Sequence, residues 1–254
     1  MSRLKLTLEE NAISFAEDAL ANAIVAEETP KRWKFAILSL IQAIELSLKE
    51  LLRRQHPYLI YKNIDNPDKT VGIDQATHRL RLIAEIALTA DESSALRAAV
   101  DVRNEIVHHY VDEAVADLKL VFARLLGFLN DFHGKHLEEP LQDAIDDELW
   151  QRGVKIKEYG EELYRRAKER LAADDLTDDA VITCPNCGWD ALTAWGEQQD
   201  RCYVCGHIEH LVVCDRCQKI MIFGEHEEHD DKKYCWDCLV YITDDYWHEQ
   251  AHGK

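Results

Sequence analysis

The sequence predicts a mainly α-helical chain that ends in a small cysteine-rich region with short β-hairpins. Two observations carry this prediction. Before residue 184 the apolar residues recur with the period of an α-helix, and strand signals are few. From there on, all eight cysteines of the chain stand in four Cys-x-x-Cys pairs, a spacing typical of metal-binding turns. We therefore expect a helical domain followed by a metal-stapled one.

Helix-start signals place the first two helices. The segment 7–10 (Thr-Leu-Glu-Glu) has the pattern of a capping box and predicts a helix from there to about residue 28. A Thr-Pro pair at 29–30 predicts the next start, because proline is favoured at the first helical position. Apolar residues follow one face through 37–52, and the helix is expected to end at the His-Pro pair at 56–57.

The rest of the helical part is expected to contain a long loop and four more helices. The loop is predicted at 57–74 and the helices at about 75–89, 92–109, 113–133 and, after Pro140, continuously to Ala172. An acidic linker precedes the cysteines. The predicted domains are a helical domain at 1–137, a helical connector and linker at 138–180, a tandem metal-binding region at 181–242 and a tail at 243–254.

The N-terminal segment predicts where the chain works. It lacks the apolar core and cleavage site of a signal peptide, and no stretch approaches the roughly 18 apolar residues of a membrane span. We therefore expect a cytoplasmic protein without a membrane partner. Thiols stay reduced in that compartment, so paired cysteines bind metal in preference to forming disulfides or a redox dithiol.

The cysteines predict two structural zinc ions. Two Cys-x-x-Cys pairs supply the four thiolates of one tetrahedral shell, and a closed shell leaves no position for a substrate, so no catalytic metal is expected. An iron centre is the alternative metal. The predicted ligands are Cys184, Cys187, Cys202, Cys205, Cys214, Cys217, Cys235 and Cys238.

The spacing of the pairs favours two tandem zinc ribbons. Sequential pairing closes loops of ordinary length for a ribbon, whereas first-with-third pairing resembles a RING finger. The segment between Cys205 and Cys214 is too long for the usual RING spacing. Gly188 and Gly206, each directly after a pair, resemble the left-handed turns of zinc ribbons.

The charge of the chain is unevenly distributed. Of the formal net charge of −18, residues 1–137 carry 17 Lys+Arg against 20 Asp+Glu, and residues 138–254 carry 13 against 28. Zinc modules that bind nucleic acid are usually basic. The acidic C-terminal region therefore favours contact with a protein partner or inhibitor, dimer formation, or repulsion or mimicry of nucleic acid. A merely solubilising surface is the alternative.

The helix expected at 92–109 contains Arg103-Asn104-Glu105-Ile106-Val107-His108-His109. Histidine titrates near neutral pH, so His108 suits general acid or base catalysis. Arg103 offers a permanently charged fork of donors for a phosphate. Asn104 and His108 share a helix face, but Arg103 and His108 are about 140° apart on an ideal helix. In the alternative interpretation these cations merely satisfy a helix C-terminus.

With the segment 33–52 and the HRLRLI segment at 78–83, this motif resembles the HEPN domain family over about residues 8–135. The resemblance implies an all-α bundle and a metal-independent endoribonuclease of toxin or antiviral defence. It also implies a homodimer in which paired motifs face each other. Arg103, Asn104 and His108 are then the catalytic candidates, with Glu45 and His109 as possible supporting residues. The alternative is a non-catalytic module that binds a nucleotide or protein, with the acidic ribbons as its interaction surface.

Overall fold

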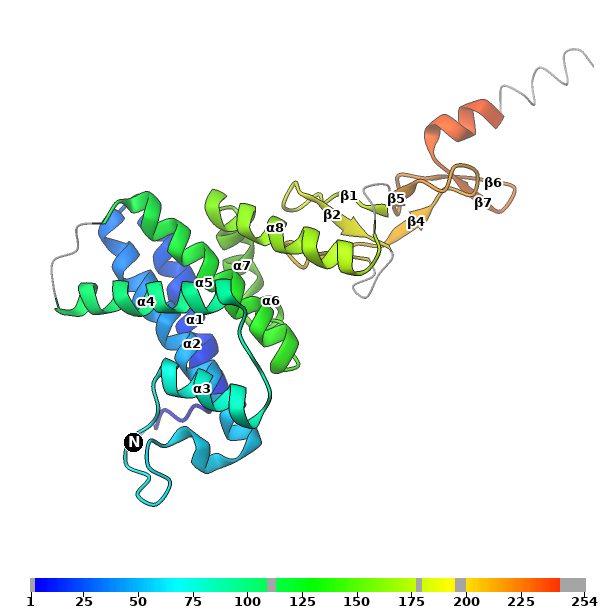
Figure 1. Cartoon of the computed structure of the whole chain (residues 1–254). Coiled ribbons are helices and arrows are strands. Elements are labelled where there is room, and N and C mark those ends of the chain that lie inside the picture. The colour runs from blue at the N-terminus through cyan, green and yellow to red at the C-terminus, as the bar shows by residue number, and fades with distance from the viewer. Residues whose placement is uncertain (1–2, 109–112, 177–179, 195–199, 243–254) are drawn as a thin grey trace, which may run out of the picture. The chain divides into compact units, whose positions relative to one another are not determined.

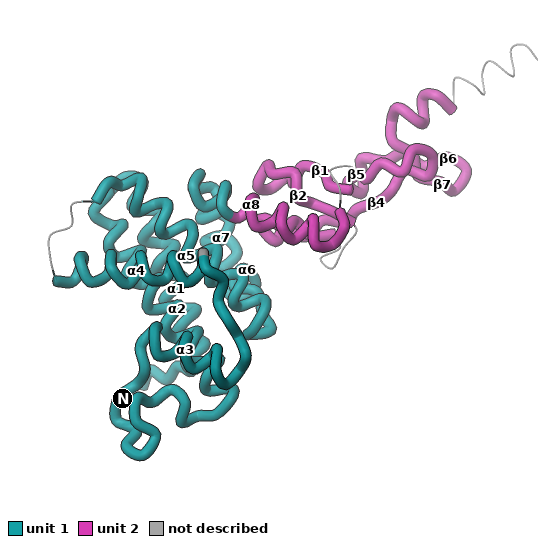
Figure 2. Tube along the Cα trace, viewed as in Figure 1, with its two compact units in different colours: residues 1–162 teal, residues 163–254 magenta. Residues whose placement is uncertain are grey.

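The computed structural model describes residues 3–108, 113–176, 180–194 and 200–242. It divides into two compact units, residues 1–162 and residues 163–254 (Figure 2). Helices dominate the first unit, and short antiparallel strands occupy the second (Figure 1). The prediction of a mainly α chain with a small β region is confirmed.

The first helix begins where its cap predicts. In α1 (Leu8–Ala26) the Thr7 hydroxyl accepts from the Glu10 amide at 3.1 Å, and the Glu10 carboxylate accepts from the Thr7 amide at 2.7 Å. The buried face of α1 is rich in alanine, and small side chains permit a close approach to the next helix. That helix is α2 (Trp33–Gln55), entered through the 3₁₀ turn η1 (Pro30–Arg32).

Helix α2 is the centre of the first unit. It packs against α1, α3 (Ile73–Ile83), α4 (Ala90–His108) and α5 (Val115–His136), as Figure 1 shows. Such a helix is apolar on several faces because it has neighbours on several sides. Trp33, at its start, is completely buried and meets Phe122 of α5 edge-to-face at 5.4 Å.

A buried hydrogen-bond pair joins α2 to α5. His133 is 2 % exposed, and its Nε2 lies 2.9 Å from the Ser47 hydroxyl. The Ser47 hydroxyl donates to the Ala43 carbonyl at 2.9 Å, so its oxygen accepts from His133. Burial, reinforced by the positive charge of Arg54, lowers the pKa of His133 to about 4. This histidine is therefore neutral in the folded chain at pH 7.

The segment after α2 differs from the expected plain loop. It contains the 3₁₀ turn η2 (Pro57–Ile60) and a bridge between Tyr61 and Thr70. Helix α3 ends at Ile83, earlier than predicted, because Glu85 has a positive φ of 56° and the Ile86 amide turns back to the Leu80 carbonyl. The chain then runs irregularly to α4.

The prediction of one continuous helix after Pro140 is wrong. The structure has three helices there, α6 (Leu141–Ala144), α7 (Asp147–Val154) and α8 (Lys157–Ala173). Ile145 has extended backbone, and the Asp146 carboxylate accepts from the Leu149 amide at 2.9 Å, which starts a new helix. A Cβ on Gly153 would lie 2.5 Å from a Leu20 methyl group, so glycine lets α7 approach α1. Residues 138–162 thus belong to the helical unit, whereas the sequence predicted a separate connector.

The described residues of the second unit form three small antiparallel sheets. Strands β1 (Ile182–Thr183), β2 (Asp190–Thr193) and β3 (Arg201–Cys202) form the first sheet in sequence order. Strands β4 (Leu211–Val213) and β5 (Ile220–Ile222) form the second, and β6 (Glu227–His229) and β7 (Lys232–Tyr234) the third. The predicted short hairpins are present.

Candidate functional site

The eight cysteines form two clusters that follow the order of the sequence. One cluster contains Cys184, Cys187, Cys202 and Cys205, and the other Cys214, Cys217, Cys235 and Cys238. In each, the four ligand atoms lie within 4.8 Å of one another. All eight are free thiols. The expected sequential grouping is confirmed, and the cross-braced alternative is excluded.

The sulfur spacing fits a tetrahedral metal ion. The Cys184–Cys205 and Cys187–Cys202 sulfurs are 3.8 and 3.7 Å apart, and the Cys217–Cys235 sulfurs are 3.8 Å apart. A tetrahedron with metal–sulfur bonds of about 2.3 Å has edges of about 3.8 Å. Each cluster can therefore hold one metal ion, and both are compatible with structural zinc.

The first three cysteine pairs share one backbone turn. The residue after each pair has a positive φ, which is 76° at Gly188, 75° at Gly206 and 61° at Gln218. Its amide donates to the carbonyl of the pair's first cysteine at 2.9 Å in all three turns. The fourth pair differs, because Cys238 lies in a helical segment that begins at residue 236. The glycines of the sequence thus indicated two of these three left-handed turn positions, and the one at Gln218 was not predicted.

The first cluster is packed against α8 within the second unit. Tyr164 of α8 stacks on Trp189, two residues after Cys187. Arg170 of α8 donates to the carbonyl of Tyr203, which lies between the two cysteines of the second pair. The Tyr203 hydroxyl donates to Asp174 at 2.5 Å. Both turns of this cluster are therefore tied to the same helix.

The two clusters differ in exposure. In the first, Cys184, Cys202 and Cys205 are at most 2 % exposed, whereas Cys217 of the second cluster is on the surface. Without metal, hydrogen bonds from neighbouring thiols lower the pKa of Cys184 and raise the pKa of Cys202. A metal ion binds thiolates, so it must displace the protons of the four thiols.

The Arg-Asn-His motif lies on the last turns of α4. Arg103, Asn104 and His108 are all exposed. None of their side chains has a hydrogen-bond or ion-pair partner among the residues that the structure describes. His109 lies outside the described residues. The motif is thus open to solvent.

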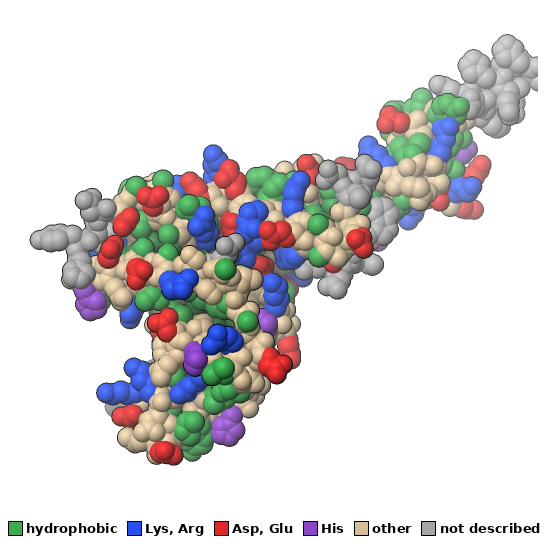
Figure 3. Space-filling model, viewed as in Figure 1, with side chains coloured by type: hydrophobic (Ala, Val, Ile, Leu, Met, Phe, Trp, Pro, Cys, Tyr) green, Lys and Arg blue, Asp and Glu red, His purple; other side chains and the backbone are tan. Residues whose placement is uncertain are grey.

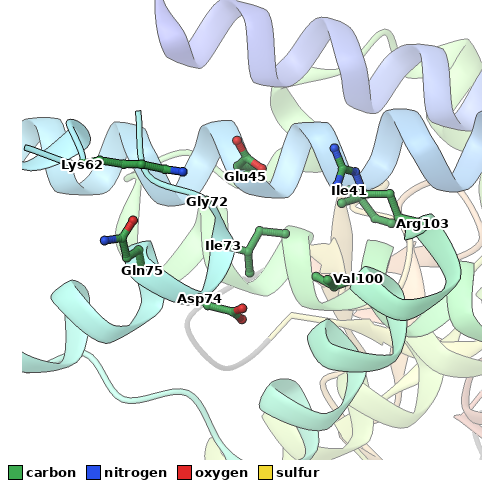
Figure 4. Close-up of a pocket in the computed structure, with 9 residues that line it drawn as sticks. All are labelled: Ile41, Glu45, Lys62, Gly72, Ile73, Asp74, Gln75, Val100 and Arg103. Carbon is green, nitrogen blue, oxygen red and sulfur yellow. The ribbon is translucent and has the colours of Figure 1, made fainter. Parts of the chain in front are cut away.

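Arg103 borders an open pocket of about 290 Å³ between α2, α3 and α4. Figure 4 shows Arg103 extending from α4 toward α2. Glu45 on α2, Lys62 on the loop before α3 and Asp74 on α3 line the same pocket. Arg79 holds that loop by donating to the carbonyls of Leu59 and Tyr61. The pocket therefore contains charges of both signs.

Glu45 shares this pocket with Arg103, but its ion-pair partner is another residue. Its carboxylate accepts from Lys49 at 2.6 Å, and the Lys49 ammonium also donates to the Thr70 hydroxyl at 3.0 Å. His108 does not line the pocket. Within one chain, the structure places Arg103 in the hollow and leaves His108 at the end of the helix.

A second open pocket of about 380 Å³ adjoins the first and shares Ile73 and Asp74 with it. Its basic side chains are His78 and Arg81 of α3 and Arg97 of α4. No signal in the sequence indicated Arg97, because nothing local shows which face of α3 meets which face of α4. His78 and Arg81 belong to the HRLRLI segment, but no role could be assigned to them from the sequence. Figure 3 shows both basic and acidic side chains on the face of the molecule that α3 and α4 form.

No family model, no curated protein and no solved structure matches this chain. Among the described residues, no helix has the length and apolar character needed to cross a bilayer.

Proposed function

We propose that the chain is a metal-independent endoribonuclease of the HEPN type, acting as a homodimer in toxin or antiviral defence. The observation that carries the proposal is the exposed, unpartnered set of Arg103, Asn104 and His108 at the end of α4. A purely structural helix end would be expected to use its cations on terminal carbonyls. The all-α fold around the motif is consistent with the resemblance.

In this mechanism His108 moves the proton and Arg103 binds the phosphate. A neutral imidazole accepts the proton of the ribose 2′-hydroxyl, and an imidazolium protonates the leaving 5′-oxygen. The Arg103 guanidinium stabilises the charge that develops on the phosphate. Because Arg103 and His108 do not share a hollow in one chain, the proposed reaction site is completed by the second copy.

The test is cleavage of single-stranded RNA by the full-length protein, with mass spectrometry of the products. We expect ends with a 2′,3′-cyclic phosphate and full activity during a short exposure to chelator. His108→Ala should lower the rate by about 10²–10⁴-fold. Arg152→Ala, on an exposed position of α7, is the control and should leave the rate unchanged. Full activity in His108→Ala would refute the role of His108.

We propose zinc as the metal of both clusters. Four thiolates with these separations suit zinc or iron, and the reducing cytoplasm that we expect for this chain keeps such shells intact. The zinc ions then hold the two halves of each cluster together and leave the chemistry to the helical unit. Elemental analysis of the purified chain should find about two zinc atoms per molecule. Two iron atoms in their place would contradict this assignment.

A role in protein contact is our second candidate, for the ribbon unit. Phe223, Trp236 and Tyr241 are 54, 65 and 54 % exposed in a region of acidic sequence. Exposed aromatic side chains are typical of contact surfaces. Trp236→Ser should remove the protein adducts that the wild-type chain forms under cross-linking, and unchanged adducts would count against this role.

A further inference from the structure

The two adjoining pockets form one groove between α3 and α4. On α3 the lining residues 74, 77, 78 and 81 are spaced as neighbours on one helix face. On α4 the lining residues 93, 96, 97, 100 and 103 also follow one face. Two facing stripes therefore run along the groove, and one of them ends at Arg103.

Unpartnered cations line this groove, although the chain is acidic overall. His78, Arg81 and Arg97 have no hydrogen-bond or ion-pair partner among the described side chains. Some basic residues elsewhere in the same unit are paired with carboxylates, as Arg54 is with Glu9 and Glu50. Arginines left open around a hollow are suited to bind phosphate.

The groove also offers an apolar surface of the size of a nucleotide site. Ile73, Leu88 and Leu96 line the larger pocket, whose volume is about 380 Å³, within the usual range of small-molecule sites. Along α4, Arg97 and Arg103 are about 9 Å apart in axial rise. Phosphates bound at these two arginines would therefore belong to different nucleotides.

We propose that this groove is a nucleotide-binding subsite for single-stranded RNA next to the reaction site. Arg81 and Arg97 bind a backbone phosphate, and the base lies against His78 and the apolar wall. The negative charge of Glu45 does not prevent phosphate binding, because it is paired with Lys49. Asp74 is the carboxylate at the junction of the two pockets. The inference rests on the proposed function, since it assigns the neighbouring motif to cleavage of the same strand.

The test is RNA binding in the full-length His108→Ala protein, which should not cleave. The anisotropy of a fluorescein-labelled oligouridine reports its Kd. In this background, replacing Arg81 and Arg97 with Gln should weaken binding by about a hundredfold, on the order of tenfold for each lost contact. The slope of log K against log salt should become shallower by about 0.7, because one phosphate contact is lost. Replacing Arg124 and Arg152 with Gln, two exposed arginines outside the groove, changes the net charge equally. This control should alter Kd by less than about twofold.

Equal losses in both double variants, or no loss in the groove variant, would overturn the subsite. Absence of oligouridine binding by the His108→Ala protein would also overturn it, as would dissociation of a dimer by the groove substitutions, measured by sedimentation. Cleavage by the wild-type chain is measured separately. Groove-dependent binding without cleavage refutes the proposed function but retains the subsite. If the wild-type chain cleaves RNA and the groove variant binds oligouridine normally, the subsite alone is refuted.

Discussion

Tyr164 of α8 stacks on Trp189 of the first ribbon, with ring centroids 4.5 Å apart and planes inclined by 21°. Trp189 directly follows the left-handed Gly188 after the first cysteine pair. The metal-binding turn and the helix therefore stabilise each other. This relationship gives the first cluster a structural role beyond holding its own hairpins.

Trp189→Ala should loosen α8. Loss of the stacked pair is expected to cost about 1 kcal/mol, which raises the hydrogen-exchange rate of the α8 amides at 163–173 by about fivefold. Trp236→Ala is the matched control, because Trp236 is 65 % exposed on the second ribbon. Equal exchange of α8 in Trp189→Ala and the wild type would show that the stack contributes nothing.

The second cluster should release its metal before the first. Cys217 is exposed, whereas Cys184 and Cys202 are 1 and 0 % exposed, and solvent access controls the exchange of a bound metal. We expect two phases of release to a chromogenic chelator, separated by about tenfold or more in rate. Cys217→Ser should remove the fast phase and Cys202→Ser the slow one. A single phase in the wild type would contradict the difference between the clusters.

Stability of the helical unit should fall below pH 6.5 because of His133. Burial lowers its folded-state pKa from 6.5 to about 4. Between these values the unfolded chain binds the extra proton. The stabilisation is therefore complete above pH 6.5 and is lost as the pH falls toward 4, by about 3 kcal/mol.

Urea unfolding followed by circular dichroism at several pH values tests this loss. His133→Gln keeps a donor for Ser47 but does not titrate, so its stability should vary less between pH 6.5 and 4 than that of the wild type. His56→Gln, at an exposed position, should retain the wild-type slope. A wild-type slope in His133→Gln would assign the acid sensitivity to other groups.

A site shared by two subunits predicts complementation. Arg103→Ala and His108→Ala should each be inactive alone. After random subunit exchange, half of the dimers contain one intact site, so the mixture should recover about a quarter of the wild-type activity. A mixture that stays inactive would show that both residues must come from the same chain.

Much of the fold could be predicted because its signals are local. The Thr7–Glu10 capping box and the Thr-Pro start at 29–30 depend on residues within one helical turn. The sequential cysteine clusters depend on pairs separated by short hairpins. The helix break at Asp146 could not be predicted in the same way, because its cap competes with the helix propensity of the surrounding residues. The close approach of Gly153 to Leu20 could not be predicted either, because these residues are far apart in the chain.

The sequence by itself determined the helical class and the motif at 103–108, and it favoured the sequential grouping of the eight cysteines. These features depend on residue type and short spacing. Only the tertiary structure decided that α3 and α4 border a groove that ends at Arg103, that Glu45 pairs with Lys49, and that α8 packs against the first cluster. The reason is physical: these relationships arise where α3 and α4 pack against α2 and where α8 meets the ribbon turns, and periodicity along the chain does not specify which helix faces meet.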